Sequence, residues 1–181
     1  CAEERSSSDK FWWRTNAQRI PQWSNASRPH AVRALILYPL NALVEDQLRR
    51  LRMTLDSPMI HKWMDDERRG NRILFGRYTG HTPVPGKPDN KNALKKLKTL
   101  MCQADKAWEQ VERVLQQPEV DEEIRYHFAR IDGGEMWSRW DMQETPPDIL
   151  ITNYSMLNIM LMRDIEDAIF TKTREWLHED E

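Results

Sequence analysis

Residues 31–55 read AVRALILYPLNALVEDQLRRLRMTL, and this stretch decides the fold class. Its first part, residues 31–38, is a short and nearly continuous apolar run that ends before Pro39. Such a run is typical of a strand buried on both faces, as in a parallel sheet with helices above and below. Asn41 is a good N-cap residue, and apolar residues follow it at helical spacing. The stretch therefore predicts a strand, a tight turn and a helix.

The rest of the chain continues this alternation. Residues 72–79 (RILFGRYT) and 149–152 (ILIT) are interpreted as two more strands. The longest amphipathic pattern covers 92–117. Residues 156–162 are apolar nearly all round, which predicts a helix buried under the sheet, and 164–181 predict one more helix. Strands that alternate with helices indicate an α/β fold with a parallel sheet flanked by helices.

The chain divides into two parts by composition. Residues 1–30 are polar and irregular and are interpreted as a lead-in or an insertion. Residues 31–181 are expected to form a partial domain, with a helical insertion at about 88–145. Tryptophans embedded in the polar lead-in are candidates for a protein interface, and core packing is the alternative. These residues are Trp12, Trp13 and Trp23.

Bulk composition excludes several classes of protein. The 181 residues are 39% hydrophobic and 31% charged with a net charge of −2, so any contact with nucleic acid must come from a local face. The two cysteines, Cys1 and Cys102, lie outside any CxxC pattern, which argues against a disulfide framework and a zinc site and fits the cytoplasm. There is no apolar run of 18 residues and no secretory signal, so no membrane partner is expected.

The turns after the predicted strands are the candidate functional loops, because the carboxyl ends of parallel strands meet at one edge of a sheet. These turns are residues 39–41, 79–82 and 152–155. Backbone amides at the mouth of a helix bind anions such as phosphate without reading a base. Any strand–helix unit has this shape, so geometry alone leaves an ordinary structural turn as the alternative.

Three segments resemble motifs of one helicase family. The first is similar to the motif called Ia of superfamily 2 DEAD/DEAH-box-like helicases, and the next, residues 76–82 (GRYTGHT), resembles the family's Tyr-Thr-Gly-x-Thr element. His81 stands where many members carry an acidic residue. Residues 140–143 and 146–157 resemble the third element. The residues that match the first motif are Tyr38, Pro39, Leu40, Asn41, Ala42, Leu43, Asp46, Gln47 and Arg49.

The resemblance implies a fold and a set of binding residues. It implies part of the first RecA-like lobe of a helicase, in which these elements line the nucleic-acid track and hold the backbone of one strand. A solvated helix face is the alternative interpretation of Arg49. By resemblance, the candidates for nucleic-acid contacts are Pro39, Asn41, Arg49, Arg77, Thr79, Gly80, Thr152 and Asn153.

The resemblance also implies an activity for the parent protein. That protein is expected to be an ATP-dependent helicase or translocase that uses ATP and Mg²⁺ and pairs this lobe with a second RecA-like lobe. Its expected partners are nucleic acid, with DNA favoured, and other proteins. The branch looks like bacterial helicases with a C-terminal accessory domain, some of them in DNA repair and some in anti-phage systems such as DISARM.

The chain lacks the two motifs that handle ATP. A P-loop reads Gly-x-x-x-x-Gly-Lys-(Ser/Thr), whereas residues 80–88 (GHTPVPGKP) have one spacer too many and Pro88 in place of the hydroxyl. No acidic Walker B run follows a strand. We therefore expect no catalytic, cofactor-binding or metal-binding residue here, no ATPase activity of the chain alone, and a position between the two motifs of the parent.

Two alternatives stay open. The chain could be a non-catalytic nucleic-acid or protein-binding module from a split or degenerate helicase, or a purely structural scaffold that binds no single-stranded oligonucleotide. The lysine-rich stretch 87–106 offers a local phosphate-binding face, although a solvated helix start is preferred.

Overall fold

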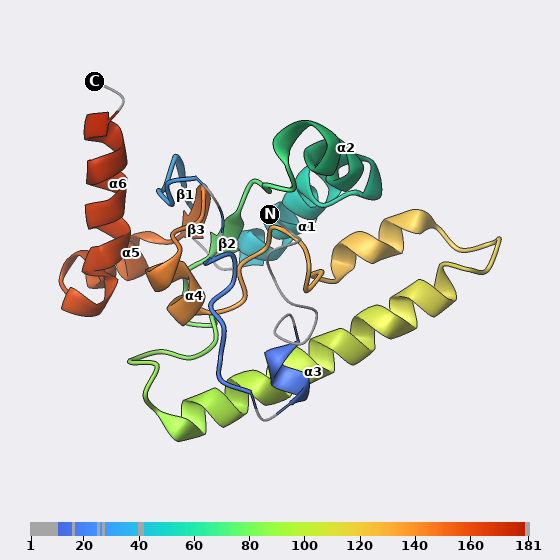
Figure 1. Cartoon of the computed structure of the whole chain (residues 1–181), viewed down its shortest axis with the longest axis horizontal. Coiled ribbons are helices and arrows are strands. Elements are labelled where there is room, and N and C mark those ends of the chain that lie inside the picture. The colour runs from blue at the N-terminus through green and yellow to red at the C-terminus, as the bar shows by residue number, and fades with distance from the viewer. Residues whose placement is uncertain (1–10, 16, 25, 27, 40–41, 180–181) are drawn as a thin grey trace.

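A parallel sheet of three strands lies at the centre of the described residues, with helices on both of its faces (Figure 1). The computed structural model describes residues 11–179 apart from 16, 25, 27 and 40–41. The strand order is β1-β3-β2. The bounds are Ala34–Leu37 for β1, Phe75–Arg77 for β2 and Ile149–Thr152 for β3. The predicted α/β class, with a parallel sheet and flanking helices, is confirmed.

The register makes the three strands end at nearly the same level. Leu37 of β1 lies opposite Thr152 of β3, and Arg77 of β2 lies opposite Ile151. The two edges of the sheet differ. β2 is bridged on its outer side, where Met136 N donates to Phe75 O at 2.7 Å. Among the described residues, β1 has a strand neighbour on one side only.

Helix α1 covers one face of the sheet, and α2 packs beside α1. α1 (Ala42–Leu55) follows β1 closely, as predicted, and its residues Val44 and Leu48 pack against Phe75 and Ile151 of the strands. α2 (Pro58–Arg68) begins where the Ser57 hydroxyl accepts a hydrogen bond from the amide of the third helical residue.

Helices from the C-terminal half cover the other face. Leu150 of β3 points to this side, while its neighbour Ile151 points to α1, which explains why the strand is apolar at successive positions. Met142 and Ile169 are fully buried here. The covering elements are α4 (Arg139–Glu144), α5 (Tyr154–Leu161), the 3-10 helix η4 (Asp164–Glu166) and α6 (Asp167–Glu179).

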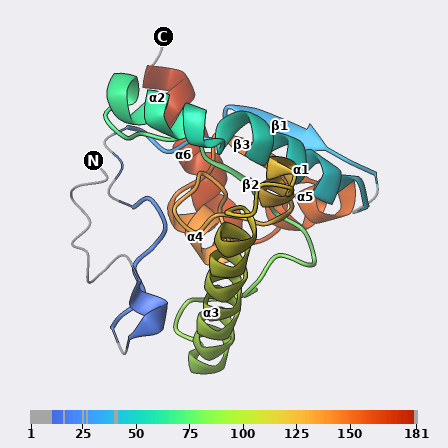
Figure 2. The same ribbon diagram turned by 90° about the vertical axis from the view of Figure 1, so that its right-hand side faces the viewer.

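A long helix projects away from the sheet (Figures 1 and 2). It is α3 (Lys91–Val114), followed by the short 3-10 helix η3 (Glu122–His127). The 3-10 helix η2 (Trp12–Arg14) packs against α3, and Trp12 and Trp13 are buried there, 5% and 7% exposed. The hypothesis of an exposed interface at these two indoles is wrong, because they fill the space between the lead-in and α3.

Helix α5 also departs from its prediction. Only Met156 and Met160 are buried, whereas Tyr154 is 64% and Leu161 63% exposed. The predicted helix packs against the core through one side, but the expectation that it is a buried helix is wrong, because the described residues cover that side only. The apolar pattern correctly predicted a helix, but no described residue packs over its outer side.

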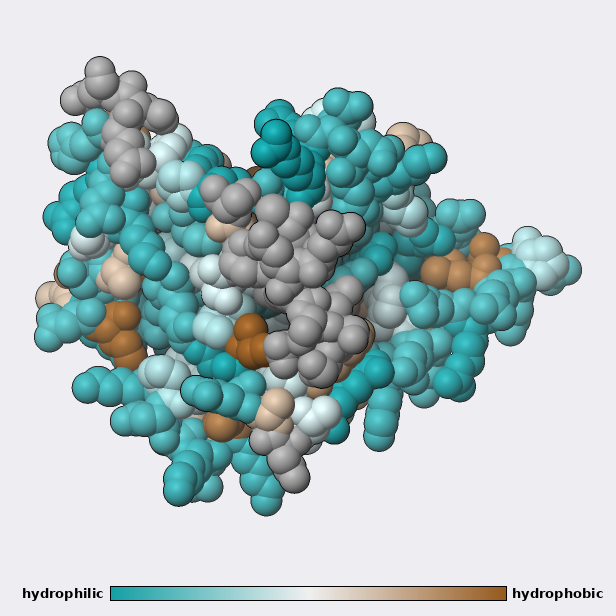
Figure 3. Space-filling model, viewed as in Figure 1, coloured by the Kyte–Doolittle hydropathy of each residue, from teal (hydrophilic) through white to brown (hydrophobic). Residues whose placement is uncertain are grey.

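The visible surface is mostly hydrophilic. Figure 3 shows isolated apolar spots on one face rather than a continuous patch. Among the described residues, no helix has the length and apolar character that crossing a membrane requires.

Candidate nucleic-acid interface

The carboxyl ends of the three strands lie side by side at one edge of the sheet. Hydrogen bonds join them directly: Tyr38 N donates to Thr152 O at 3.0 Å, and Tyr78 N donates to Ile151 O at 2.7 Å. The predicted juxtaposition is therefore confirmed for the ends of the three strands and for the turns after β2 and β3, whereas only Pro39 of the first predicted turn lies within the described residues. It follows from the parallel register alone, since strands that end level deliver their turns to one line.

The turn after β2 is locked by its own hydroxyl and backbone groups. Thr82 Oγ1 donates to Arg77 O at 2.7 Å and accepts from Thr79 N at 2.9 Å. The buried Arg139 of α4 donates to Thr79 O at 2.7 Å. Thr79 is 1% exposed, whereas Gly80 beside it is exposed, and a Cβ added there would meet nothing within 4 Å.

A buried network supports this turn from beneath. The Tyr78 hydroxyl donates to Glu166 Oε1 at 2.8 Å and accepts from Gln143 Nε2 at 2.8 Å. Both Tyr78 and Glu166 are fully buried. Burial, followed by the hydrogen bond and charge of Glu166, raises the pKa of the Tyr78 hydroxyl well above its ordinary value. The tyrosine thus stays neutral and fixes the end of β2 to α4 and η4.

The turn after β3 is tied to the turn after β2. Thr152 is fully buried, and its Oγ1 donates to Tyr78 O at 2.6 Å. Asn153 caps α5, because its Oδ1 accepts from Met156 N at 2.8 Å. The hydroxyls of Thr79 and Thr152 point into the fold, so these two predicted contact residues position the turns and do not present their hydroxyls at the surface.

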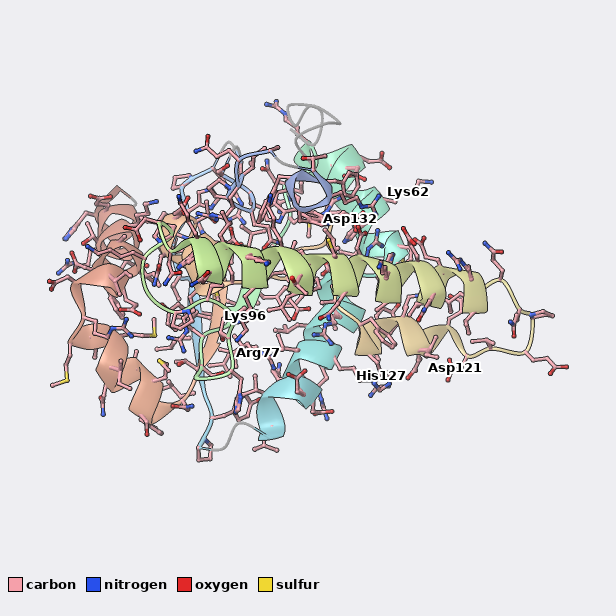
Figure 4. All side chains as sticks on the ribbon, turned by 90° about the horizontal axis from the view of Figure 1, so that it is seen from below. Lys62, Arg77, Lys96, Asp121, His127 and Asp132 are labelled. Carbon is pink, nitrogen blue, oxygen red and sulfur yellow. The ribbon has the colours of Figure 1, made fainter. Side chains whose placement is uncertain are left out.

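The two predicted arginines each face a carboxylate. Arg77, which lies beside the first turns of α1 (Figure 4), pairs with Glu45. Arg49 Nη2 lies 2.8 Å from Glu123 Oε2. Both pairs are solvent-exposed in part, and such pairs contribute about 0–1 kcal/mol. A phosphate can therefore replace either carboxylate at little cost in free energy.

The turn after β1 is described only in part. Pro39 is exposed at the end of β1. Leu40 and Asn41 lie outside the described residues, so the role predicted for Asn41 stays a prediction.

Sequence reasoning missed the residues that hold the turns in place. Gln143 and Glu166 are buried polar side chains. Gln143 ends the stretch 140–143 that the family resemblance covers, but no role was predicted for it, and Glu166 stands in no recognisable motif. Arg139 was missed as well, although Trp140 beside it belongs to a stretch that the family resemblance covers. The sequence does not show that such a polar side chain is buried, because its burial depends on how the helices pack in three dimensions.

Residues 80–88 do not fit the phosphates of ATP. Asn90 caps the helix that follows, and its Oδ1 accepts from Asn92 N at 3.0 Å and Ala93 N at 3.1 Å. These amides are the ones that a phosphate would use at a helix start. In the part of the chain that the structure describes, no group of three or more His, Cys, Asp or Glu side chains is arranged to hold a metal ion.

The described residues thus form an α/β fold in which three parallel strands end nearly level at one edge of the sheet. The chain is similar to Druantia protein DruE of Escherichia coli (strain UMEA 4076-1), with 34% identity over 192 residues. The match covers 87% of this chain and 10% of that protein, so the chain spans about a tenth of the length of the curated relative it matches. No family model matches the chain, and no solved structure matches it.

Proposed function

We propose that this chain is the nucleic-acid-gripping segment of an ATP-dependent helicase or translocase that acts in phage defence. The observation that carries the proposal is that three parallel strands, each next to a motif-like segment, end level at one edge of the sheet. The similarity to Druantia protein DruE supports the role in defence. ATP and Mg²⁺ binding, and a second RecA-like lobe, are assigned to other parts of the parent protein.

The geometry suits a contact with the sugar–phosphate backbone. Gly80 is exposed at the crest of a rigid turn, and without a side chain it lets a phosphate approach the backbone closely. Arg77 and Arg49 supply positive charge once a phosphate displaces Glu45 and Glu123. Contacts of this kind read no base, which is what a motor that steps along any sequence needs.

The same geometry sets the strength of binding. Two arginine–phosphate contacts on single-stranded nucleic acid give a slope of about −1.4 in log K against log salt. The net charge of −2 adds no general attraction. Binding by this chain is therefore expected to be weak and to be measurable at low salt.

The test is fluorescence anisotropy of a labelled single-stranded DNA oligonucleotide titrated with the chain at low salt. The double substitution Arg49→Gln with Arg77→Gln is expected to weaken binding about tenfold, because each exposed charged contact contributes about 0.5–1 kcal/mol. Arg50→Gln is the matched control, since Arg50 lies on the same helix and pairs with the exposed Asp46.

Two results would contradict the proposal. One is an absence of binding at low salt, and the other is an equal loss of affinity in the Arg50→Gln control. An RNA oligonucleotide of the same sequence, used in a parallel titration, measures the expected preference for DNA.

A further inference from the structure

A cavity lies at the amino edge of the sheet, opposite the edge that carries the candidate interface. Its volume is about 450 Å³, and Ala34 at the start of β1 and Ile149 at the start of β3 lie in its wall. Pockets of roughly 300–1,000 Å³ are typical of small-molecule sites. This cavity shares none of its lining residues with the turns at the carboxyl edge.

Positive charge is in excess in the wall of this cavity. Arg28 Nη1 lies 2.5 Å and Arg33 Nη1 2.6 Å from the same Oδ1 of Asp148. Asp148 is 5% exposed and also accepts from Leu74 N at 2.7 Å, so it is fixed in place. One carboxylate therefore balances two guanidinium groups, and one positive charge is left over.

Of two further arginines in the wall, Arg68 increases this excess and Arg72 is balanced by a carboxylate. Arg68 lies over the ring of Trp63, 5.6 Å from its centroid, and forms no ion pair with a described carboxylate. Arg72 pairs with Asp65 at 2.7 Å, but its Nε is buried without a hydrogen-bond partner among the described residues. Arginine is the side chain best suited to hold a phosphate, because its donors match the phosphate oxygens.

The floor of the cavity is apolar and open to solvent. Trp63 is 46% and Ile73 38% exposed, and Met64 also lines the cavity. Half-exposed apolar side chains gain free energy when a flat apolar group covers them. The cavity thus combines an apolar floor with a wall that carries about two surplus positive charges.

We infer that this cavity binds a nucleotide through its 5′-phosphate, with the base against Trp63 and Ile73 and the phosphate against Arg68 and the Arg28–Arg33 pair. A phosphate monoester carries close to two negative charges at neutral pH, which matches the surplus in the wall. The nucleotide is either free or the 5′-phosphorylated end of a strand, since the two share this chemistry. The inference does not depend on the function proposed for the carboxyl edge.

Isothermal titration of the full chain with AMP tests the inference, with adenosine and inorganic phosphate in parallel. AMP is expected to bind at least about tenfold more tightly than either half alone, because it gains both the apolar and the charged contact. Arg68→Gln and Trp63→Ala are each expected to weaken AMP binding about fivefold. Both side chains are partly exposed, so the fold tolerates their replacement, and circular dichroism checks this.

Lys62→Gln is the matched control. Lys62 is the exposed neighbour of Trp63 on α2 (Figure 4), and it does not line the cavity. Its replacement removes one positive charge and should leave AMP affinity unchanged. The Arg49→Gln with Arg77→Gln variant should also bind AMP normally, which separates this site from the carboxyl edge.

The inference is overturned if AMP binds no more tightly than adenosine or phosphate, or if Lys62→Gln weakens binding as much as Arg68→Gln. A 5′-phosphorylated dinucleotide distinguishes the two sources. Tighter binding than AMP identifies a strand end as the ligand, and weaker binding identifies a free nucleotide.

Discussion

The two edges of the sheet differ in how many carboxylates pair with their arginines. At the carboxyl edge, Arg77 faces Glu45 and Arg49 faces Glu123, so each cation has its own carboxylate. At the amino edge, Arg28 and Arg33 share a single buried carboxylate. The net charge of −2 shows neither arrangement. Whether an anion can bind at an edge therefore depends on how the arginines there are paired with carboxylates, and the net charge of the chain does not predict it.

The edges also differ in how firmly they are built. The turns of the carboxyl edge are joined to one another and to a buried network below them. The amino edge depends on one acidic side chain, Asp148, that holds two arginines and a backbone amide. Substitutions that remove these different supports measure the difference directly.

The largest effect is expected at the amino edge. Asp148→Ala leaves Arg28 and Arg33 without their carboxylate and Leu74 N without an acceptor. Removing one partner of a buried ion pair destabilises a protein by about 3–5 kcal/mol. Urea unfolding followed by circular dichroism measures the loss. Asp46→Ala, at an exposed ion pair, is the control. A loss below about 1 kcal/mol in Asp148→Ala would show that this carboxylate stabilises the fold no more than an exposed ion pair does.

A smaller loss is expected beneath the carboxyl edge. Tyr78→Phe removes the hydroxyl that donates to Glu166 and accepts from Gln143, and it leaves a buried carboxylate without this donor. The free energy of unfolding should fall by about 2 kcal/mol. Tyr154→Phe is the matched control, because Tyr154 is 64% exposed. Equal effects of the two substitutions would show that the network does not stabilise the turn.

The same tyrosine gives a pH dependence with a definite sign. The pKa of Tyr78 is raised in the folded chain, first by burial and then by Glu166. An unfolded tyrosine loses its proton near about pH 10. Above that pH the unfolded state binds fewer protons than the folded state, so stability falls as pH rises. Unfolding free energies at alkaline pH should decline less steeply in Tyr78→Phe than in the unsubstituted chain.

A third loss tests the link between two turns. Thr152→Val keeps the shape of the side chain but removes the hydrogen bond from Oγ1 to Tyr78 O. The expected destabilisation is about 1 kcal/mol, with a larger proportional loss of single-stranded DNA binding if the turns act together. Thr54→Val, at a hydroxyl that donates within α1, is the comparison. Unfolding and anisotropy titrations made on the same preparations separate stability from binding.

The smallest effect sharpens the charge comparison. Glu45→Gln frees Arg77 from its partner and should strengthen binding of single-stranded DNA about twofold, since exposed pairs are weak. Glu67→Gln removes the same charge from the exposed side of α2. A gain in Glu67→Gln as large as that in Glu45→Gln would indicate a general charge effect instead of a released arginine.

Residues 31–55 are the part of the fold that the sequence predicted best. Their pattern predicted a strand, a turn and a helix, and the structure has β1 and α1 within this range. The parallel class and the meeting of the three turns followed from the same reasoning, because they depend on periodicity and strand direction. These features are local in sequence or follow from topology.

The remaining features depend on contacts between distant residues. Glu166 reaches Tyr78 across 88 positions, and Arg28 reaches Asp148 across 120. Trp12 and Trp13 lie in a polar segment and are nonetheless buried, because α3 packs over them. Neither composition nor periodicity records such pairings, so the support of the candidate interface and the cavity at the amino edge required the structure.

The two edge strands of the described sheet differ in how open they are to pairing with another strand. β2 already carries an extended neighbour at Glu135, so an added strand would find its amides and carbonyls taken there. Within the part of the chain that the structure describes, β1 has no strand on its outer side, and its Leu35 is half-exposed. We therefore expect an added strand to pair with β1, and we expect a lysine or proline placed within Ala34–Leu37 to prevent such pairing.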